Sequence, residues 1–190
     1  MQSLLLRGAA CGLFCGCLPA AVAGGFIEDS KLKLQLRNVY FNENFRDEQG
    51  MTARAAATAK SERTEWAQGF LLDYQSGFTQ GTIGVGLDAM ALVGVKLDSG
   101  RGRTGTDLLP VHDDGRSADE FSRLGLTGKV KVSATELRYG SHVPELPVVK
   151  ASDSRLLPQV FEGGLLTSSE LEGLTFTGGR LDKVIDRAST

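Results

Sequence analysis

The chain has 190 residues, of which 41% are hydrophobic, and its 21 basic and 23 acidic residues give a formal net charge of −2. This balance gives no support to a nucleic-acid partner, because proteins that bind nucleic acids carry clustered basic residues. Beyond the N-terminal segment, no stretch is long and apolar enough for a transmembrane helix. The protein is therefore either soluble or meets a membrane as a β-barrel.

The first 23 residues have the pattern of a secretory signal peptide. Arg7 is the only charged residue among them, apolar and small residues run from Gly8 to Val22, and Ala21-Val22-Ala23 forms an A-x-A cleavage site. The apolar run is too short for a transmembrane anchor. A lipid anchor on Cys17 is an alternative, but the residues before it fit a lipobox poorly. We therefore expect residues 1–23 to be removed on export.

All three cysteines lie in this segment: Cys11, Cys15 and Cys17. The mature chain, residues 24–190, therefore has no disulfide framework, no thiolate metal site and no cysteine nucleophile. The two histidines, His112 and His142, are too far apart in the sequence to form a paired metal-ligand motif. We expect no metal and no cofactor.

Hydrophobic residues in the mature chain recur with a period of two. The clearest case runs from Ile83 to Leu97, where apolar residues take every second position. Such alternation predicts strands with one apolar and one polar face. The predicted strands lie near residues 31–41, 65–76, 82–98, 121–132, 135–142, 165–169 and 174–181.

Long and short connections alternate between these predicted strands. The long ones cover about residues 42–64, 99–120 and 143–163, and the short ones cover 77–81, 133–134 and 170–173. A transmembrane β-barrel has this pattern because short turns lie at one rim and long loops at the other. A soluble β-sandwich gives no reason for such regular alternation.

Glycines lie on the polar face of the strand predicted at 82–98. Gly84, Gly86 and Gly94 occupy positions where a soluble sheet would carry long polar side chains. Glycine weakens a strand and usually marks a bend or a close approach. We interpret these glycines as sites of barrel curvature or as room for a loop folded inward, with an ordinary bulge as the alternative.

Four segments of the mature chain carry a family resemblance. They are residues 25–30 (GFIEDS), 66–70 (WAQGF), 76–89 (SGFTQGTIGVGLDA) and 154–159 (SRLLPQ). In this order and spacing they resemble the OprD family of substrate-specific outer-membrane porins. The resemblance covers about residues 24–181, which is nearly all of the mature chain.

The resemblance implies an all-β fold, an antiparallel transmembrane barrel of eighteen strands that often forms homotrimers in the outer membrane of Gram-negative bacteria. This chain would supply the first seven strands, after export through the general secretory route. The third external loop of the family folds into the lumen as a constriction, and here it corresponds to residues 143–163. Family members pass small anionic or zwitterionic solutes, such as amino acids, along a column of Arg and Lys.

The chain differs from the family pattern in its length. After the seventh predicted strand, residues 180–190 form a polar run, which we interpret as the start of an external loop. Bacterial barrels have even numbers of strands. We therefore expect residues 24–190 to be the N-terminal part of a longer barrel, which makes this chain a fragment.

The polar residues of each strand should face the lumen, because a bilayer requires apolar residues outside. The candidate pore-lining cations are Lys33, Arg37, Arg123, Lys129, Lys131 and Arg138, and the candidates in the constriction loop are Asp153, Ser154 and Arg155. Fixed cations select anions by replacing lost hydration, and a guanidinium offers a carboxylate two parallel hydrogen bonds. The alternative is that these cations are only solvated, or paired across strands with acids such as Asp88.

These features predict passive diffusion of small carboxylate-bearing solutes, with outer-membrane lipid as the second partner and no enzymatic activity. The sequence has no G-x-S-x-G motif, and Gly84-Val85-Gly86 lies inside a strand, so it is no phosphate-binding loop. Two alternatives stay open. A complete eight-stranded barrel with an adhesive or structural role requires an eighth strand and a terminal aromatic residue. A secreted β-sandwich that binds a ligand requires stable folding without detergent.

Overall fold

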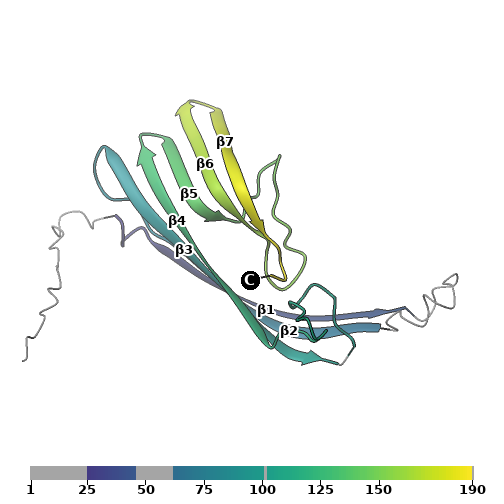
Figure 1. Cartoon of the computed structure of the whole chain (residues 1–190). Helices are drawn as coiled ribbons and strands as arrows, with labels where there is room; N and C mark the ends of the chain where they lie inside the picture. The colour runs from purple at the N-terminus through teal and green to yellow at the C-terminus, as the bar shows by residue number, and fades with distance from the viewer. Residues whose placement is uncertain (1–24, 46–61, 101, 190) are drawn as a thin grey trace, which may run out of the picture.

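The computed structural model describes residues 25–45, 62–100 and 102–189, drawn in colour in Figure 1. The predicted signal peptide and most of the first long connection lie outside these ranges. The described residues form one antiparallel sheet of seven strands, paired in chain order. The strands are β1 (Lys31–Asn44), β2 (Glu62–Gln75), β3 (Ile83–Ser99), β4 (Glu120–Val132), β5 (Thr135–His142), β6 (Val160–Leu171) and β7 (Leu174–Ile185). No helix in these ranges is long and apolar enough to cross a membrane.

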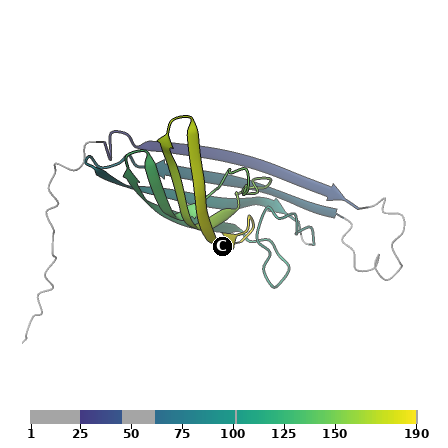
Figure 2. The ribbon, with the colours of Figure 1, turned by 90° about the horizontal axis from the view of Figure 1, so that it is seen from above.

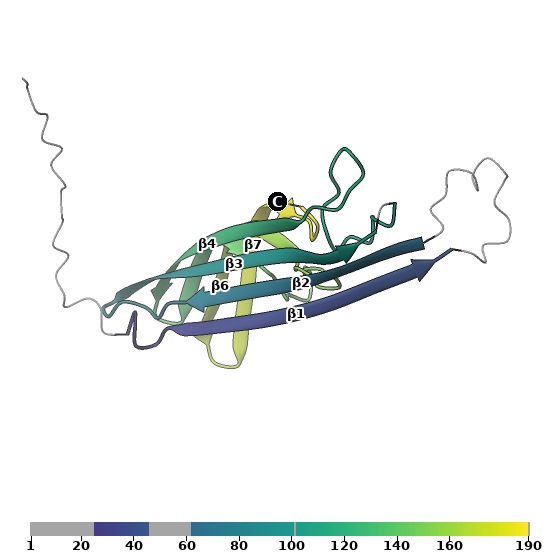
Figure 3. The same ribbon diagram turned by 90° about the horizontal axis from the view of Figure 1, so that it is seen from below.

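The sheet curves into an open half-barrel. It rises from β1 and β2 through β3 and β4 to β7, and the loop between β5 and β6 lies on its concave side (Figure 1). Figure 2 shows the same curvature from above, and in Figure 3 β1 to β4 lie side by side when viewed from below. A single sheet contradicts the secreted sandwich, which needs two packed sheets. Because β1 and β7 do not pair, the described residues do not close into an eight-stranded barrel either.

The predicted number of strands is confirmed, but some predicted boundaries were wrong. β6 begins at Val160, so the loop before it ends at Gln159 and not at Gly163. β7 continues to Ile185, so the polar residues after Leu181 are strand and not loop. The physical reason is that a ladder needs only backbone pairing: Val160 lies opposite Ile185, and Lys183 forms a 3.4 Å ion pair with Glu162 on the neighbouring strand.

The two faces of the sheet differ in polarity as the period of two predicted. On β1 the outward side chains include Leu32, Leu34 and Leu36, each at least 60% exposed, and on β4 Leu124 is 75% exposed. The intervening residues, such as Lys33, face the concave side. A contiguous apolar surface of this size is unusual on a soluble monomer and matches the lipid-facing band of a transmembrane barrel.

Tight turns close one end of the sheet. β4 and β5 are joined by Ser133 and Ala134, with φ of 53° at Ser133, and Gly173 in the turn between β6 and β7 has φ of 75°. Two-residue hairpin loops need a positive φ, because only that backbone twist matches the flanking strands. The Glu170 carboxylate, near the end of β6, binds the turn between β4 and β5 by accepting hydrogen bonds from the Ala134 N–H and from the hydroxyls of Ser133 and Thr135.

The long connections at the other end fold onto the inner wall. Leu108 and Leu109 come from the connection between β3 and β4, and Leu156 and Leu157 come from the loop between β5 and β6. All four are at most 1% exposed and pack against inward residues of β2, β3 and β4. Burying each such leucine contributes about 1.5–3 kcal/mol. The loops are thus held by an apolar core on the concave side.

The inward glycines make room for these contacts. A Cβ added at Gly94 would overlap the ring of Phe121 and lie 2.9 Å from Leu156 Cδ2. A Cβ added at Gly86 would lie 2.5 Å from Lys129 Cε. The interpretation of Gly94 as room for an inward loop is therefore confirmed, while Gly86 provides space for a charged side chain of the wall.

Candidate solute pathway on the inner wall

The register places the six predicted pore-lining cations on the concave face. On β4, Arg123, Lys129 and Lys131 lie opposite Leu92, Gly86 and Gly84 of β3. Arg138 of β5 lies opposite Lys129. Lys33 and Arg37 of β1 line a cavity of about 520 Å³, which also includes Asp153 of the inward loop. The cations share one face, but their surroundings divide them into several groups.

Arg37 binds the inward loop. Its Nη2 lies 2.9 Å from Asp153 Oδ2, and its Nη1 pairs with the other carboxylate oxygen. This parallel two-point contact is the strongest common geometry for an arginine and a carboxylate. Asp153 therefore neutralises Arg37 and anchors residues 143–159 to β1.

Arg155 connects the inward loop to the connection between β3 and β4. Its Nε donates to the carbonyl oxygen of Thr106 at 2.8 Å, and its guanidinium lies 5.1 Å from the centre of the Phe41 ring on β1. Ser154 accepts a 2.8 Å hydrogen bond from Arg187, which follows β7. The predicted loop residues are thus all engaged with other parts of the chain.

Glu65 of β2 supports this arrangement and was missed by the sequence reasoning. Its side chain is fully buried, and its carboxylate accepts hydrogen bonds from the Thr106 N–H at 3.1 Å and from the hydroxyls of Thr106 and Ser117. Glu65 therefore holds the segment whose carbonyl binds Arg155. The sequence offered one signal for Glu65, an acidic residue at an inward position of a strand. That signal did not single it out, because polar residues were expected at all inward positions.

Arg123 binds two segments that lie far apart in the sequence. It donates to the carbonyl oxygens of Pro158 at 3.0 Å, Arg187 at 2.7 Å and Ser189 at 2.8 Å, and also to that of Asp186. These contacts occupy four of the five N–H donors of a guanidinium. Arg123 thereby fixes the end of the inward loop and the segment after β7, a function that the strand pattern could not reveal.

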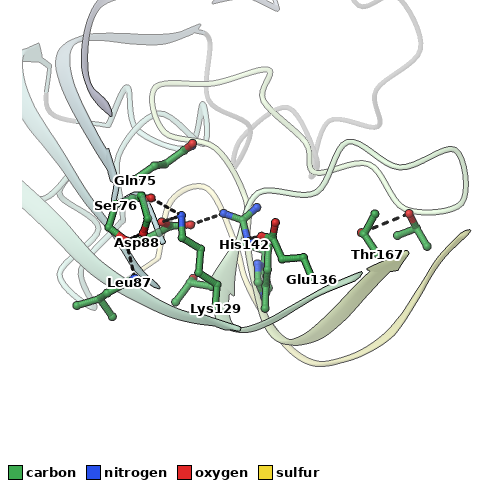
Figure 4. A network of polar contacts seen from close by, with 12 residues as sticks. Gln75, Ser76, Leu87, Asp88, Lys129, Glu136, His142 and Thr167 are labelled. Carbon is green, nitrogen blue, oxygen red and sulfur yellow. Dashed lines mark hydrogen bonds and ion pairs between the residues drawn. The ribbon is translucent and has the colours of Figure 1, made fainter. Parts of the chain in front are cut away.

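Lys129 and Arg138 share the carboxylate of Asp88. Lys129 Nζ lies 2.6 Å from Asp88 Oδ1, and Arg138 Nη2 pairs with Asp88 Oδ2. Figure 4 shows Lys129 directed at Asp88 and at the backbone of Ser76, whose carbonyl oxygen accepts a 2.6 Å hydrogen bond from Nζ. For Lys129, the pairing with Asp88 that the sequence left as an alternative is the observed arrangement.

Lys33 and Lys131 form the remaining group. Within the ranges that the structure describes, neither makes an ion pair. Lys131 Nζ lies 5.6 Å from the centre of the Phe78 ring and lines a cavity of about 410 Å³ near the short turns. Lys33 lies opposite Asp73 in the register and lines the larger cavity. Of the six predicted cations, these two are the ones with neither an ion pair nor a hydrogen bond among the residues that the structure describes.

The residues that the structure describes offer no metal centre. Among residues 25–45, 62–100 and 102–189, no three His, Cys, Asp or Glu side chains group in a way that could hold a metal ion. What the wall offers instead is fixed charge, with Lys33 and Lys131 facing cavities on the concave side.

Comparison with known proteins identifies the family. Residues 24–190 match the family described as outer membrane porin, OprD family. The chain belongs to the OprD family of porins. Porins are channels rather than enzymes, so the family supports the expectation of a non-enzymatic protein in the outer membrane of a Gram-negative bacterium.

Individual OprD-family relatives agree with this assignment. The porin-like protein GalP of Pseudomonas putida is 49% identical over 160 residues, which cover 84% of this chain and 37% of GalP. OccK9 (OpdG) of Pseudomonas aeruginosa has a crystal structure that superposes with a TM-score of 0.79 at 50% identity, covering 87% of this chain and 41% of OccK9. The crystal structure of Pseudomonas aeruginosa OpdK with vanillate superposes with a TM-score of 0.75 at 49% identity, covering 87% of this chain and 39% of OpdK. The chain thus spans about two fifths of the length of these relatives.

Proposed function

We propose that this chain forms a section of porin wall that guides small carboxylate-bearing solutes, such as amino acids, by passive diffusion. The observation that carries the proposal is the pair Lys33 and Lys131, two inward ammonium groups without an ion pair in the described ranges, each facing a cavity. Fixed cations attract anions without binding them too tightly to leave. The vanillate in the OpdK structure, an aromatic carboxylate, supports the same class of solute.

The outward face supports outer-membrane lipid as the other partner. Its exposed leucines on β1 and β4 would meet acyl chains, whereas in water they would promote association between molecules. Removal of residues 1–23 on export and assembly into homotrimers belong to the same proposal. Mass spectrometry of the protein extracted from membranes would test the first, and chemical crosslinking in the membrane would test the second.

The experiment compares uptake of gluconate with uptake of sorbitol, which has a similar size and no charge. The full chain is expressed in a porin-deficient Gram-negative host, purified from the outer membrane and reconstituted in lipid vesicles. We expect faster entry of gluconate, because a unit charge at about 4 Å contributes about 1 kcal/mol even in bulk water, or about a fivefold preference. Equal uptake of the two solutes, or no uptake, would contradict the proposal.

Matched variants identify the residues responsible. Lys33→Gln and Lys131→Gln each remove one inward cation, and each should lower the gluconate preference by up to about fivefold. Arg116→Gln removes one cation from an exposed position in the connection between β3 and β4, where it pairs with Asp114. The control variant should keep the wild-type preference. An equal loss in all three variants would indicate a general charge effect and not a pathway along the wall.

A further inference from the structure

Two cations of the inner wall lie directly opposite each other. Lys129 of β4 and Arg138 of β5 are register partners on the concave face. Like charges at directly opposed positions of a sheet repel each other. Lys129 is also 7% exposed, so water screens its charge poorly. An arrangement of this kind requires an anion between the two side chains.

Asp88 supplies that anion from the neighbouring strand. Each of its carboxylate oxygens binds a different cation, Oδ1 with Lys129 at 2.6 Å and Oδ2 with Arg138. The side chains of Asp88 and Lys129 are 9% and 7% exposed, so this ion pair is nearly sealed from solvent, whereas the Arg138 side chain is 37% exposed. Arg138 has a further carboxylate neighbour only at 3.4 Å, in Glu136 of its own strand. Asp88 is therefore the principal counter-ion of both cations.

Asp88 presents to these cations the same chemical group that the proposed solutes carry. We propose that Asp88 is a specificity-determining residue, an internal carboxylate that occupies a carboxylate site formed by Lys129 and Arg138 and so excludes solutes from it. The proposal rests on the proposed function, because exclusion has meaning only if carboxylates travel along this wall. A nearly buried ammonium beside a guanidinium would hold a carboxylate solute tightly, and conduction requires binding weak enough for release. Occupation by Asp88 leaves Lys33 and Lys131 as the cations that solutes meet.

The surroundings of Lys129 keep the site in place when Asp88 is removed. Nζ donates to the Ser76 carbonyl oxygen at 2.6 Å and lies 4.9 Å from the centre of the Phe78 ring. The Ser76 hydroxyl in turn accepts a 2.7 Å hydrogen bond from the Leu87 N–H, which ties the short turn to β3 (Figure 4). Replacement of Asp88 should thus open a space bounded by two cations without releasing the side chain of Lys129.

Asp73 provides a matched control. It also lies on the inner face, one strand away on β2, and its carboxylate accepts a 2.9 Å hydrogen bond from Gln75. It makes no ion pair with any residue that the structure describes. Asp73→Ala and Asp88→Ala therefore remove the same charge from the same wall, but only the second frees a pair of cations.

The test is chemical rescue by acetate of the full chain folded in detergent micelles. The fluorescence of Trp66, the single tryptophan of the chain, reports thermal unfolding. Asp88→Ala should lower the midpoint of thermal unfolding by more than about 5 °C, because it leaves the buried ammonium of Lys129 without its counter-ion and leaves Arg138 with only the 3.4 Å contact to Glu136. Acetate should raise that midpoint in a saturable manner, and sodium chloride at equal ionic strength should not. Rescue no better with acetate than with chloride, or equal rescue of Asp73→Ala, would overturn the proposal.

A second set of variants covers the case in which Asp88→Ala does not fold. Asp88→Asn keeps the shape of the side chain, and Lys129→Met removes one of the two cations. The loss of stability caused by Asp88→Asn should be much smaller in the Lys129→Met background than in the wild type. An equal loss in both backgrounds would overturn the assignment of Asp88 as counter-ion.

Conductance measurements in planar bilayers distinguish a failure of the Asp88 proposal from a failure of the proposed function. In channels formed by the full chain, acetate should lower the current through Asp88→Asn, because it can bind the vacated carboxylate site. It should leave the currents through wild type and Asp73→Asn unchanged. Equal sensitivity in all three would refute the exclusion of solutes by Asp88. Absence of any channel would refute the proposed function for this chain, while the acetate rescue in micelles would still decide whether Asp88 occupies a carboxylate site.

Discussion

The buried carboxylate of Glu65 provides the most demanding test of how the inward loop is positioned. Glu65→Ala removes the acceptor of three hydrogen bonds, from the Thr106 N–H and from two hydroxyls. Hydrogen bonds to a charged group contribute about 1.5–3 kcal/mol each, so the gross loss from three of them is about 4.5–9 kcal/mol. Burying the carboxylate costs several kcal/mol, which the variant no longer bears. We expect a net loss of about 2–4 kcal/mol, concentrated in the segment around Thr106.

The loss should reach Arg155, because the Thr106 carbonyl accepts its Nε hydrogen bond. Limited trypsin digestion of the full chain in micelles measures this directly, since trypsin cleaves after arginine. Cleavage after Arg155 should become at least about tenfold faster in Glu65→Ala, the change that corresponds to about 1.4 kcal/mol of local opening. Glu65→Gln retains one oxygen acceptor and should give an intermediate rate.

Glu43→Ala is the matched control for this experiment. Glu43 lies on β1 at the same end of the sheet, and its exposed carboxylate makes a 3.8 Å ion pair with Arg63. Exposed pairs of this kind contribute at most about 1 kcal/mol. Unchanged cleavage after Arg155 in Glu65→Ala, or equal acceleration in Glu43→Ala, would refute the connection from β2 through Thr106 to the inward loop.

Three further predictions concern the loops and turns. Leu156→Ala should destabilise the folded chain by about 2–5 kcal/mol in a urea titration, because the residue is fully buried in the inner core, and a loss below about 1 kcal/mol would show that the loop is not packed on the wall. Gly173→Ala should cost about 1 kcal/mol in the same assay because of the positive φ, and an unchanged midpoint would contradict the turn geometry. The hydrogen bond and the charge of Lys96 hold the pKa of Asp119, in the connection before β4, below its usual 3.8. Since the folded-state pKa is the lower one, this pair should stabilise the fold above pH 3.8 and lose its effect as the pH falls through the folded-state value. An NMR titration of the carboxyl group should show that low midpoint in the wild type and a return toward 3.8 in Lys96→Met.

Much of the fold could be predicted from the sequence because alternation is a local property. Side chains along a strand point to opposite faces, so the alternation between Ile83 and Leu97 already assigns a lipid side and a lumen side. For the same reason Lys33 and Lys131 could be placed on the inner wall without a structure. The boundaries of β6 and β7 escaped this reasoning, because a residue such as Lys183 extends the ladder through backbone pairing and carries no apolar signal.

The sequence by itself therefore determined the all-β fold, the number of strands and the face that each candidate cation occupies. Only the tertiary structure decided which of those cations are bound by other groups of the chain. Asp153 neutralises Arg37 across a separation of 116 residues, and Asp88 reaches Lys129 and Arg138 from a different strand. The physical reason is that the charge a cation presents depends on its nearest anion, and inter-strand register with loop folding brings that anion close. Periodicity within one strand carries no information about such contacts.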